Sequence, residues 1–289
     1  MPTRPTIGLA LSGGAARGIA HVGVLRALFE NQIPIDYVAG TSAGSLVGGA
    51  WAAGMALDDI ERIGLNLRWR DIGRVTMSRL GVQSNDRLEA YLRSHLPVTR
   101  FEELPTPLAV VATELATGTP VVMRDHGDVP FAIRASCAIP GWYVPVPDEE
   151  GRQLVDGGVV AVIPSNACRS LGAEIVIAVD VNAEGALFLG PSQSVIGVVL
   201  QSMLVVQRTA SLYHQAAADM VIKPKVGHIR WDELARAKEL VDAGYQAGLE
   251  SIPRIKELID EATVKPPKWY QLRRRKKESS LKSPLRLPT

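Results

Sequence analysis

Short runs of apolar, mainly β-branched residues alternate along the chain with longer segments in which apolar residues recur every three or four positions. Runs of the first kind are typical of buried strands, and the longer segments are typical of helices. The predicted strands are Ile7–Leu11, Tyr37–Ala39, Leu108–Thr113, Glu174–Val181 and Met220–Ile222. Strands separated by helices favour an α/β fold, a three-layer sandwich with a mostly parallel central sheet flanked by helices.

Three helical segments carry further signals. The first has one apolar face, formed by Ile19, Val22, Leu25 and Phe29. A capping box of Asp86 and Glu89 is expected to begin the second, whose apolar residues are Leu88, Leu92 and Leu96. The third carries Leu234, Val241, Tyr245 and Leu249, and we expect Pro253 to break it before Ile255–Ile259.

The longest apolar stretch, Val195–Val206, is twelve residues long and is interrupted by Gln201 and Ser202. A membrane-spanning helix needs about 20 apolar residues, so we expect no transmembrane helix. The helix that this stretch begins continues to about His214, and it fits either the protein core or a lid over a site. Of these two placements, we expect the core.

The segments Gln153–Val155 and Val159–Val162, joined by Asp156-Gly157-Gly158, predict a local hairpin. Helical periodicity ends after about Val264, where Pro and Lys become frequent. We therefore expect one folded domain over residues 1–264 and a basic, disordered C-terminal tail over residues 265–289.

Composition excludes several classes of protein. A chain of 289 residues with 46% hydrophobic and 21% charged residues is not typical of disorder, and 26 Gly are too few for collagen. The net charge of +2 predicts no nucleic-acid partner, but it is unevenly divided. Residues 265–289 contain nine Lys or Arg and one Glu, a net charge of +8, which leaves −6 for residues 1–264.

The basic tail has two interpretations. Trp269, Tyr270 and Leu272 stand directly before the basic run Arg273–Lys277. Basic residues and neighbouring aromatic residues favour peripheral contact with an anionic membrane. The alternative is a solvated, disordered segment without a partner.

The two cysteines, Cys137 and Cys168, lie in apolar or helical segments and lack the spacing of a disulfide framework, which favours a reducing compartment. Residues 1–10 hold too short an apolar run for a signal peptide. We therefore expect a cytoplasmic protein, either free or peripherally associated with a membrane. No motif indicates a cofactor or a metal, and no feature indicates an oligomeric state.

The first candidate site is the glycine-rich segment Ser12–Gly18, which follows a predicted strand and begins a helix. Converging backbone N–H groups and the helix dipole at such a turn stabilise an anion or oxyanion. The segment is not a P-loop, because Ile19 and Ala20 follow Gly18 where Lys and Ser or Thr are needed. A plain strand-to-helix turn is the alternative interpretation.

The second candidate is Gly40-Thr41-Ser42-Ala43-Gly44, a G-x-S-x-G pentad after the predicted strand Tyr37–Ala39. Flanking glycines permit the strained strand-to-helix turn that holds a nucleophilic serine exposed. Gly44, Gly48 and Ala52 give the following helix a small-residue face that lets it approach the sheet closely. Ser42 is therefore the candidate nucleophile.

A serine nucleophile needs a base, and Asp156 is a candidate, although Asp-Gly between apolar runs is also a common hairpin turn. Burial of its carboxyl can raise the pKa towards neutrality and suit it to accept a proton. The histidines are weaker candidates: His21 and His95 lie in helical segments, and His126 lies in a loop more typical of solvated surface than of a metal site.

Three other functions share parts of this pattern. His214 and Asp219 have the H-x4-D spacing of glycerolipid acyltransferases. An α/β-hydrolase with a Ser-Asp-His triad shares the pentad, although its serine usually follows several strands and Ser42 follows two. A non-catalytic protein that binds a lipid or an anion at the glycine-rich segment is the third alternative.

Four segments in order resemble the patatin-like phospholipase family, particularly its compact single-domain bacterial members, over about residues 7–225. Ser12–Gly18 is similar to the family's oxyanion loop and Gly40–Gly44 to its nucleophile elbow. Arg134–Pro140 is similar to a block that lines the site, and Asp156–Gly158 to the Asp-Gly-Gly/Ala signature. The resemblance implies that residues 1–264 are a patatin-like catalytic domain.

The resemblance further implies a serine acyl hydrolase with a Ser-Asp dyad, no histidine and no cofactor, acting on ester lipids such as phospholipids, lysophospholipids or acylglycerols. Ser42 corresponds to the nucleophile and Asp156 to the base. The oxyanion would be stabilised by the N–H groups of Gly13, Gly14 and Ala15, with Arg17 ordering the loop or adding charge. Ala15 departs from the family, because a non-glycine residue resists a positive φ. The supporting glycines are Gly18, Gly40, Gly44, Gly157 and Gly158.

Overall fold

The computed structural model describes residues 4–184 and 194–264. An eight-stranded sheet forms its centre, with the order β11-β10-β1-β2-β5-β9-β8 and with β6 paired to β5. The parallel strands are β11 (Met220–Ile222), β10 (Ile175–Val179), β1 (Ile7–Leu11), β2 (Tyr37–Thr41) and β5 (Leu108–Glu114). The antiparallel strands are β9 (Gln153–Asp156), β8 (Val146–Pro147) and β6 (Pro120–Met123).

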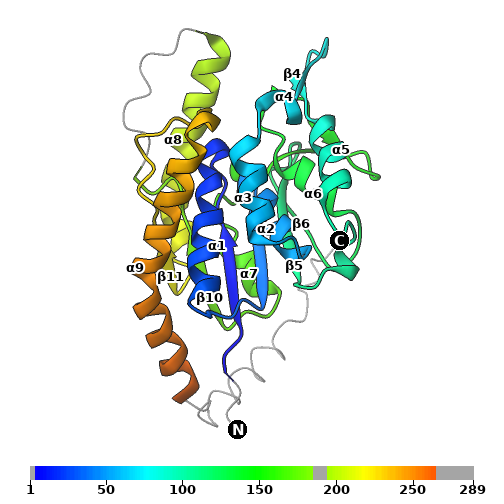
Figure 1. The fold of residues 1–289 in the computed structure, drawn as a ribbon. Helices are drawn as coiled ribbons and strands as arrows, with labels where there is room; N and C mark the ends of the chain where they lie inside the picture. Colours follow the sequence, from blue (N-terminus) through cyan, green and yellow to red (C-terminus); the bar gives the residue numbers. More distant parts are fainter. Residues whose placement is uncertain (1–3, 185–193, 265–289) are drawn as a thin grey trace, which may run out of the picture.

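Helices cover both faces of this sheet, as Figure 1 shows. Leu9 and Val38 point to a core shared with α1 (Ala20–Glu30), α2 (Ala43–Ala52) and α9 (Ala237–Val264). Their neighbours Ala10 and Ala39 point to the other face, which α7 (Ser165–Ser170) covers. Because successive strand residues point to opposite faces, strands buried on both sides are apolar throughout. The expected α/β fold and its predicted strands are confirmed.

Glycines bring α1 and α9 into direct backbone contact. A Cβ atom on Gly23 would lie 1.9 Å from the carbonyl oxygen of Val241, and one on Gly244 would lie 1.9 Å from the carbonyl oxygen of Ala20. Both distances are far below van der Waals contact, so only glycine allows this packing. At the end of α1, the Tyr245 hydroxyl donates to the Glu30 carboxylate at 2.7 Å.

The remaining elements surround the carboxyl ends of the parallel strands or the outer edge of the sheet. A second sheet has the order β3-β4-β7. Its strands are β3 (Arg74–Val75), β4 (Gly81–Ser84) and β7 (Gly141–Tyr143). The other helices are α3 (Leu57–Asn66), α4 (Trp69–Ile72), α5 (Asp86–His95), α6 (Val129–Ser136) and α8 (Val195–Gln215). The 3-10 turns are Ala15–Ile19, Phe101–Glu103, Gly157–Val159 and Leu234–Arg236.

Three local predictions about helices are wrong. Phe29 is 66% exposed, and Leu28 takes its place on the buried face of α1. No capping box forms at α5, because Asn85 is the N-cap and the Asp86 carboxylate instead binds Arg74. Pro253 does not break the last helix. Ile252 and Ile255 on either side of it are buried, and their packing offsets a local cost of about 3 kcal/mol.

The predicted hairpin at residues 153–162 is also wrong. Gln153–Asp156 forms strand β9, but its partners are β5 and β8, and the next residues form a 3-10 turn, Gly157–Val159. A Cβ atom on Gly157 would lie 2.1 Å from the carbonyl oxygen of Val111. The chain therefore turns sharply against β5 at this glycine rather than folding back beside β9.

Helix α8 does not lie in the core, contrary to the prediction. Val195 and Tyr213 are 83% and 77% exposed, and several apolar residues between them are exposed as well. Only the opposite side of the helix packs against the protein, at β7 and the 3-10 turn Gly157–Val159. The apolar residues of α8 therefore belong to two surfaces, one packed against the protein and one exposed. The number of apolar residues in the sequence does not distinguish these two surfaces.

Among the residues described, no helix combines the length and apolar character needed to cross a membrane. Cys137 and Cys168 are both free. The basic tail at residues 265–289 lies outside the described residues.

Candidate active site

Ser42 lies at the sharp corner between β2 and α2, with φ 52° and ψ −124°. This positive φ is unusual for a residue with a side chain, and neighbouring glycines make the corner sterically feasible. A Cβ atom on Gly44 would lie 2.2 Å from the carbonyl oxygen of Leu11, and one on Gly40 would lie 2.4 Å from the Ser45 Cα. A Cβ atom on Gly18 would lie 2.3 Å from that of Ala43. The supporting glycines thus allow the close approach that the pentad predicts.

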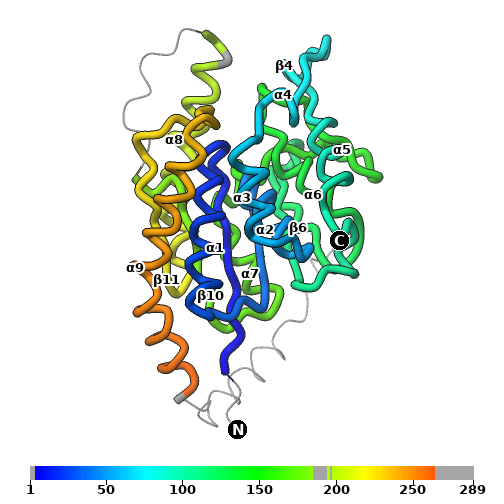
Figure 2. Tube along the Cα trace, in the orientation of Figure 1, coloured from blue at the N-terminus to red at the C-terminus, as the bar shows by residue number. Residues whose placement is uncertain are grey.

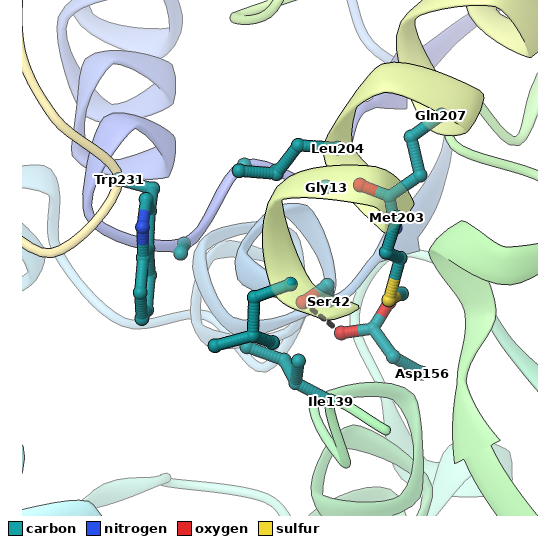
Figure 3. Close-up of a pocket in the computed structure, with 11 residues that line it drawn as sticks. Gly13, Ser42, Ile139, Asp156, Met203, Leu204, Gln207 and Trp231 are labelled. Atoms are coloured by element: carbon teal, nitrogen blue, oxygen red, sulfur yellow. Dashed lines mark hydrogen bonds between the residues drawn. The ribbon is translucent and has the colours of Figure 1, made fainter. Parts of the chain in front are cut away.

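The side chain of Ser42 points toward Asp156, as Figure 3 shows. Its hydroxyl donates to Asp156 Oδ2 at 2.6 Å, and both residues are buried. Asp156 ends β9, where its backbone N–H donates to the Ala138 carbonyl at 2.9 Å. Its other carboxylate oxygen accepts from the Gly158 N–H at 2.7 Å. Asp156 Oδ1 is therefore bound by Gly158, and Oδ2 accepts the hydrogen bond from Ser42.

The environment of Asp156 changes its acidity. Burial raises the pKa of its carboxyl to about 6, although the hydrogen bonds from Ser42 and Gly158 oppose that rise. A carboxyl with a pKa near 6 is largely ionised at neutral pH and still accepts a proton more readily than an exposed aspartate. The pair therefore has the chemistry of a nucleophile and its base.

The glycine-rich loop lies beside Ser42, and two of its three expected donors have no partner among the described residues. Gly13 N–H donates to the Val162 carbonyl at 3.0 Å, which removes it from the donors that the sequence suggested. In the part of the chain that the structure describes, the N–H groups of Gly14 and Ala15 have no hydrogen-bond partner. Ala15 adopts a φ of 49° despite its side chain. Both N–H groups line the cavity that contains Ser42.

Arg17 orders this loop from behind rather than facing the site. Its Nε donates to the Ile229 carbonyl at 2.6 Å, and one terminal nitrogen donates to the Gly227 carbonyl at 3.4 Å. The guanidinium is buried by the 226–231 loop and does not line the cavity. Of the two roles expected for Arg17, the structure therefore favours loop ordering over charge at the oxyanion.

His21 is a second buried anchor of the loop. Its Nε2 lies 2.8 Å from the Ser12 carbonyl oxygen, and burial lowers the pKa of the imidazole to about 4. The ring is therefore neutral, with its proton on Nε2 to donate to that carbonyl. His21 therefore holds the loop in position, and it does not line either cavity at Ser42.

Two positioning residues were missed by sequence reasoning. Ser136 accepts from the Ser42 N–H at 2.8 Å and donates to the Val111 carbonyl at 2.6 Å, so it fixes the corner to β5. Asn182 donates to the Gly13 carbonyl at 2.7 Å. Ser136 lies within the Arg134–Pro140 block, and Asn182 follows the carboxyl end of β10. Asn182 was a visible signal, because the carboxyl ends of parallel strands meet at one edge. Ser136 ends α6, so its only signal was its place in the Arg134–Pro140 block.

Two joined cavities open at Ser42. The first, of about 470 Å³, contains Ser42, Asp156 and the free N–H groups, and α8 covers it with Leu200, Met203, Leu204 and Gln207. The second, of about 630 Å³, shares Ala15, Ser42 and Ile139 with the first and is otherwise lined mainly by apolar side chains. A pocket that contains the Ser42–Asp156 pair thus adjoins an apolar compartment.

The histidine-based alternatives find no support in the geometry. Asp219 binds Arg169 at 2.6 Å and the Val176 N–H at 2.7 Å, at the amino end of β10, whereas Ser42 follows the carboxyl end of β2. His214 lies on α8 and does not line the Ser42 cavity, and burial lowers the pKa of its imidazole. His126 is exposed. Within residues 4–184 and 194–264, no group of three His, Cys, Asp or Glu side chains is arranged to hold a metal ion.

Comparisons with known proteins agree with the fold and the motifs. The family model for patatin-like phospholipases matches residues 9–168. An uncharacterized NTE family protein of Mycobacterium tuberculosis is 36% identical over 219 residues, which cover 74% of this chain and 59% of that protein. This chain therefore spans about three fifths of the length of that relative.

More distant relatives share a smaller part of their length. Lysophospholipase NTE1 of Mycosarcoma maydis is 35% identical over 186 residues, covering 62% of this chain and 10% of that protein. Among solved structures, VipD of Legionella pneumophila has a TM-score of 0.58 at 15% identity, covering 90% of this chain and 67% of that chain. The likeness to VipD concerns the fold alone.

The raised pKa of Asp156 predicts a pH-dependent stability difference between the wild type and Asp156→Asn. The folded state holds the proton more tightly than the unfolded chain, so this contribution is present below pH about 4 and lost as pH rises through about 6. Relative to the wild type, Asp156→Asn should gain up to about 3 kcal/mol of unfolding free energy between these conditions. Chemical denaturation at several pH values measures this difference.

The matched control is Asp86→Asn, because Arg74 lowers the pKa of Asp86. Its stability relative to the wild type should change in the opposite direction with pH. A difference between the wild type and Asp156→Asn that does not vary with pH would contradict the raised pKa.

Proposed function

The chain belongs to the patatin-like phospholipase family, and from that premise we propose that it is a serine acyl hydrolase that cleaves acyl esters of lipids. The observation that carries this proposal is the 2.6 Å hydrogen bond from Ser42 to the buried Asp156 carboxylate, beside two free backbone donors. Family membership supports lipid ester hydrolysis, and the site geometry supports a Ser-Asp dyad as the means.

In the proposed acylation step, Ser42 Oγ attacks the carbonyl carbon of the ester while its proton moves to Asp156 Oδ2. The carbonyl oxygen becomes an oxyanion, which the N–H groups of Gly14 and Ala15 stabilise. Collapse of the tetrahedral intermediate breaks the ester bond, and the leaving alcohol takes the proton from Asp156. The acyl group remains on Ser42.

In the proposed deacylation step, a water molecule attacks the acyl-Ser42 carbonyl and gives its proton to Asp156. The same two N–H groups stabilise the second oxyanion, and its collapse returns the proton from Asp156 to Ser42 Oγ. A carboxylic acid leaves. One carboxylate thus serves both steps, which is why a pKa of about 6 suits it better than the ordinary value of an aspartate.

We also propose that the acyl chain lies in the apolar cavity beside Ser42. A third cavity, of about 590 Å³, continues this compartment, and the two share Ile19, Leu46, Val47, Leu67 and Leu88. The third cavity extends toward Met55 and Leu92. A chain of methylene groups placed here exchanges water for apolar contacts, at about 0.8 kcal/mol for each CH₂.

The acidic body, residues 1–264, is proposed as the catalytic unit. Support comes from α9, which packs along α1 and against the 3-10 turn Ala15–Ile19 that follows Gly14. The competing acyltransferase needs His214 and Asp219 to act together, and Asp219 is bound by Arg169 away from the Ser42 cavity. A non-catalytic binder leaves the Ser42–Asp156 pair without a role.

Removal of either dyad member should abolish hydrolysis. Ser42→Ala and Asp156→Asn should each lower kcat/KM for a p-nitrophenyl acyl ester and for a lysophospholipid by about 10³-fold or more. Ser42→Ala should also lose labelling by a fluorophosphonate probe.

The control is Ser165→Ala, a buried serine outside both joined cavities, which should keep wild-type activity. Retained activity in Ser42→Ala together with its loss in His214→Ala would overturn the dyad in favour of the acyltransferase.

The activity should depend on the ionisation of Asp156. Only the ionised carboxylate accepts the serine proton, so kcat/KM should rise with pH through an apparent pKa of about 6 and then level off. A pH profile measured with a soluble ester checks this. A profile that falls as pH rises through 6 would exclude Asp156 as the base.

A larger side chain in the shared wall of the apolar cavities should change the preferred acyl length. In Leu46→Trp the indole fills space that a long chain needs, so the ratio of kcat/KM for dodecanoyl over butyryl esters should fall by about ten-fold or more. Leu65→Trp, at an exposed position outside these cavities, is the matched control. An unchanged ratio in Leu46→Trp would place the chain elsewhere.

A further inference from the structure

Helix α8 carries an exposed apolar stripe on the side that faces away from the protein. The exposed residues recur at about seven-residue intervals, which places them on one side of a helix. They are Val195, Val198, Val199, Val205, Val206, Leu212 and Tyr213. The opposite side of α8 carries Leu200, Met203, Leu204 and Gln207 of the Ser42 cavity. Whatever binds the stripe is therefore one helix thickness from the proposed reaction centre.

The β3–β4 hairpin presents a second group of exposed apolar residues. They are Val75, Met77, Leu80 and Val82, and Met77 near the tip is fully exposed. Single exposed apolar residues are common on protein surfaces, but four on one short hairpin form a patch of the kind that marks an interaction site. Trp69 and Ile72 of α4, just before the hairpin, line the apolar cavity beside Ser42.

The stripe and the hairpin extend from the same end of the molecule. Figures 1 and 2 show the first turns of α8 (yellow-green) and the hairpin (cyan) both at the upper end. Strand β7 connects them, since α8 packs on it and β4 pairs with it. Ile139 and Tyr143, within or next to β7, help to line the apolar cavity beside Ser42.

The two projecting segments carry a net positive charge, although residues 1–264 as a whole carry a net charge of −6. Residues 68–84 contain Arg68, Arg70, Arg74 and Arg79 and one acid, Asp71, a net charge of +3. Arg74 binds Asp86 and Arg70 lies near Asp71. Residues 195–215 contain Arg208 and no acid. Within the described chain, Arg79 and Arg208 are exposed and have no ion-pair partner.

We propose that this end of the protein is a docking face for an anionic lipid bilayer, formed by Val75, Met77, Leu80, Val198, Val205 and Val206 together with Arg79 and Arg208. Protruding apolar side chains insert among acyl chains while the arginines remain at the head groups. The inference rests on the proposed function, because a lipid hydrolase must take its substrate from such a surface. It is independent of the tail at residues 265–289.

A second copy of the chain is the strongest rival occupant, because a seven-residue stripe also suits helix pairing. The bilayer fits better for two reasons. The apolar residues lie on two separate projections, one of them a hairpin tip, rather than on a single helical seam. The unpaired arginines also favour an anionic surface over an identical basic one.

The test is co-sedimentation of the full chain with vesicles of about 70% phosphatidylcholine and about 30% phosphatidylserine. All proteins carry Ser42→Ala, so that hydrolysis does not alter the vesicles. Met77→Glu/Leu80→Glu and Val205→Glu/Val206→Glu should each weaken binding by about ten-fold or more. The matched control is Phe29→Glu/Leu115→Glu, which changes exposed apolar residues outside the docking face and should bind within about two-fold of the parent.

Equal binding by the parent and both docking-face variants would overturn the proposal. The proposal would also be overturned if the variants changed the oligomeric state of the protein, measured as molar mass by light scattering, while vesicle binding stayed unchanged. That outcome would assign the face to a second copy of the chain. All the side chains that are replaced by Glu are exposed, so the variants should fold like the parent.

A kinetic measurement separates this proposal from the proposed function. With Ser42 intact, Met77→Glu/Leu80→Glu should hydrolyse a soluble p-nitrophenyl ester at the wild-type rate and vesicle-borne lysophospholipid about ten-fold more slowly. Equal losses on both substrates would contradict docking. If the wild type hydrolyses neither substrate and the vesicle-binding differences remain, the docking face stands and the hydrolase proposal fails.

Discussion

The close approach of α2 to the parallel strands is the constraint on which the rest of the site depends. Gly44 brings the first turn of α2 against the Leu11 carbonyl, and Gly48 packs against Val38. At this distance the chain passes from strand to helix within one residue, and Ser42 must take a positive φ. The backbone strain lies at Ser42 itself, and the resulting conformation directs the Ser42 hydroxyl toward Asp156.

Burial gives the second half of the site its properties. An exposed aspartate is a weak base, and removal from water raises the pKa of Asp156 to about 6. The N–H groups of Gly14 and Ala15, which are half-buried, have no partner inside the described protein. The burial of an ionised Asp156 costs folding free energy. Both features are consistent with a site organised for a negative charge that forms only during reaction.

The sequence predicted the strands and the serine corner from local signals, because buried parallel strands are continuously apolar and flanking glycines permit the strained turn. The pairing of Ser42 with Asp156 has no such local signal, and its prediction depended on the resemblance to the patatin-like phospholipases. The errors arose where tertiary contacts decide. The Gly157 turn depends on contact with Val111, the Gly13 N–H is occupied by Val162, and Arg17 binds carbonyls more than 200 positions away. Each of these partners is distant in the sequence, so the residues around the motif do not reveal it.

Helix α8 is the most instructive case, because its composition suits a core helix and its position does not. One side covers the Ser42 cavity and the other is open to solvent. This arrangement places a single element between the Ser42 cavity and the outer surface, so the proposed chemistry and the proposed docking face share one helix. The same helix closes the space in which the oxyanion would form.

In the proposed site, the corner at Ser42 holds the serine oxygen between the buried Asp156 carboxylate and the Gly14 and Ala15 N–H groups. A crystal structure of the protein after reaction with a long-chain alkylphosphonate tests it most directly. The account predicts phosphorus bonded to Ser42 Oγ, one phosphonyl oxygen within hydrogen-bond distance of the Gly14 and Ala15 N–H groups, and the alkyl chain in the cavity lined by Leu46 and Leu88. Phosphorus on another residue, or a phosphonyl oxygen that turns away from both N–H groups, would contradict it.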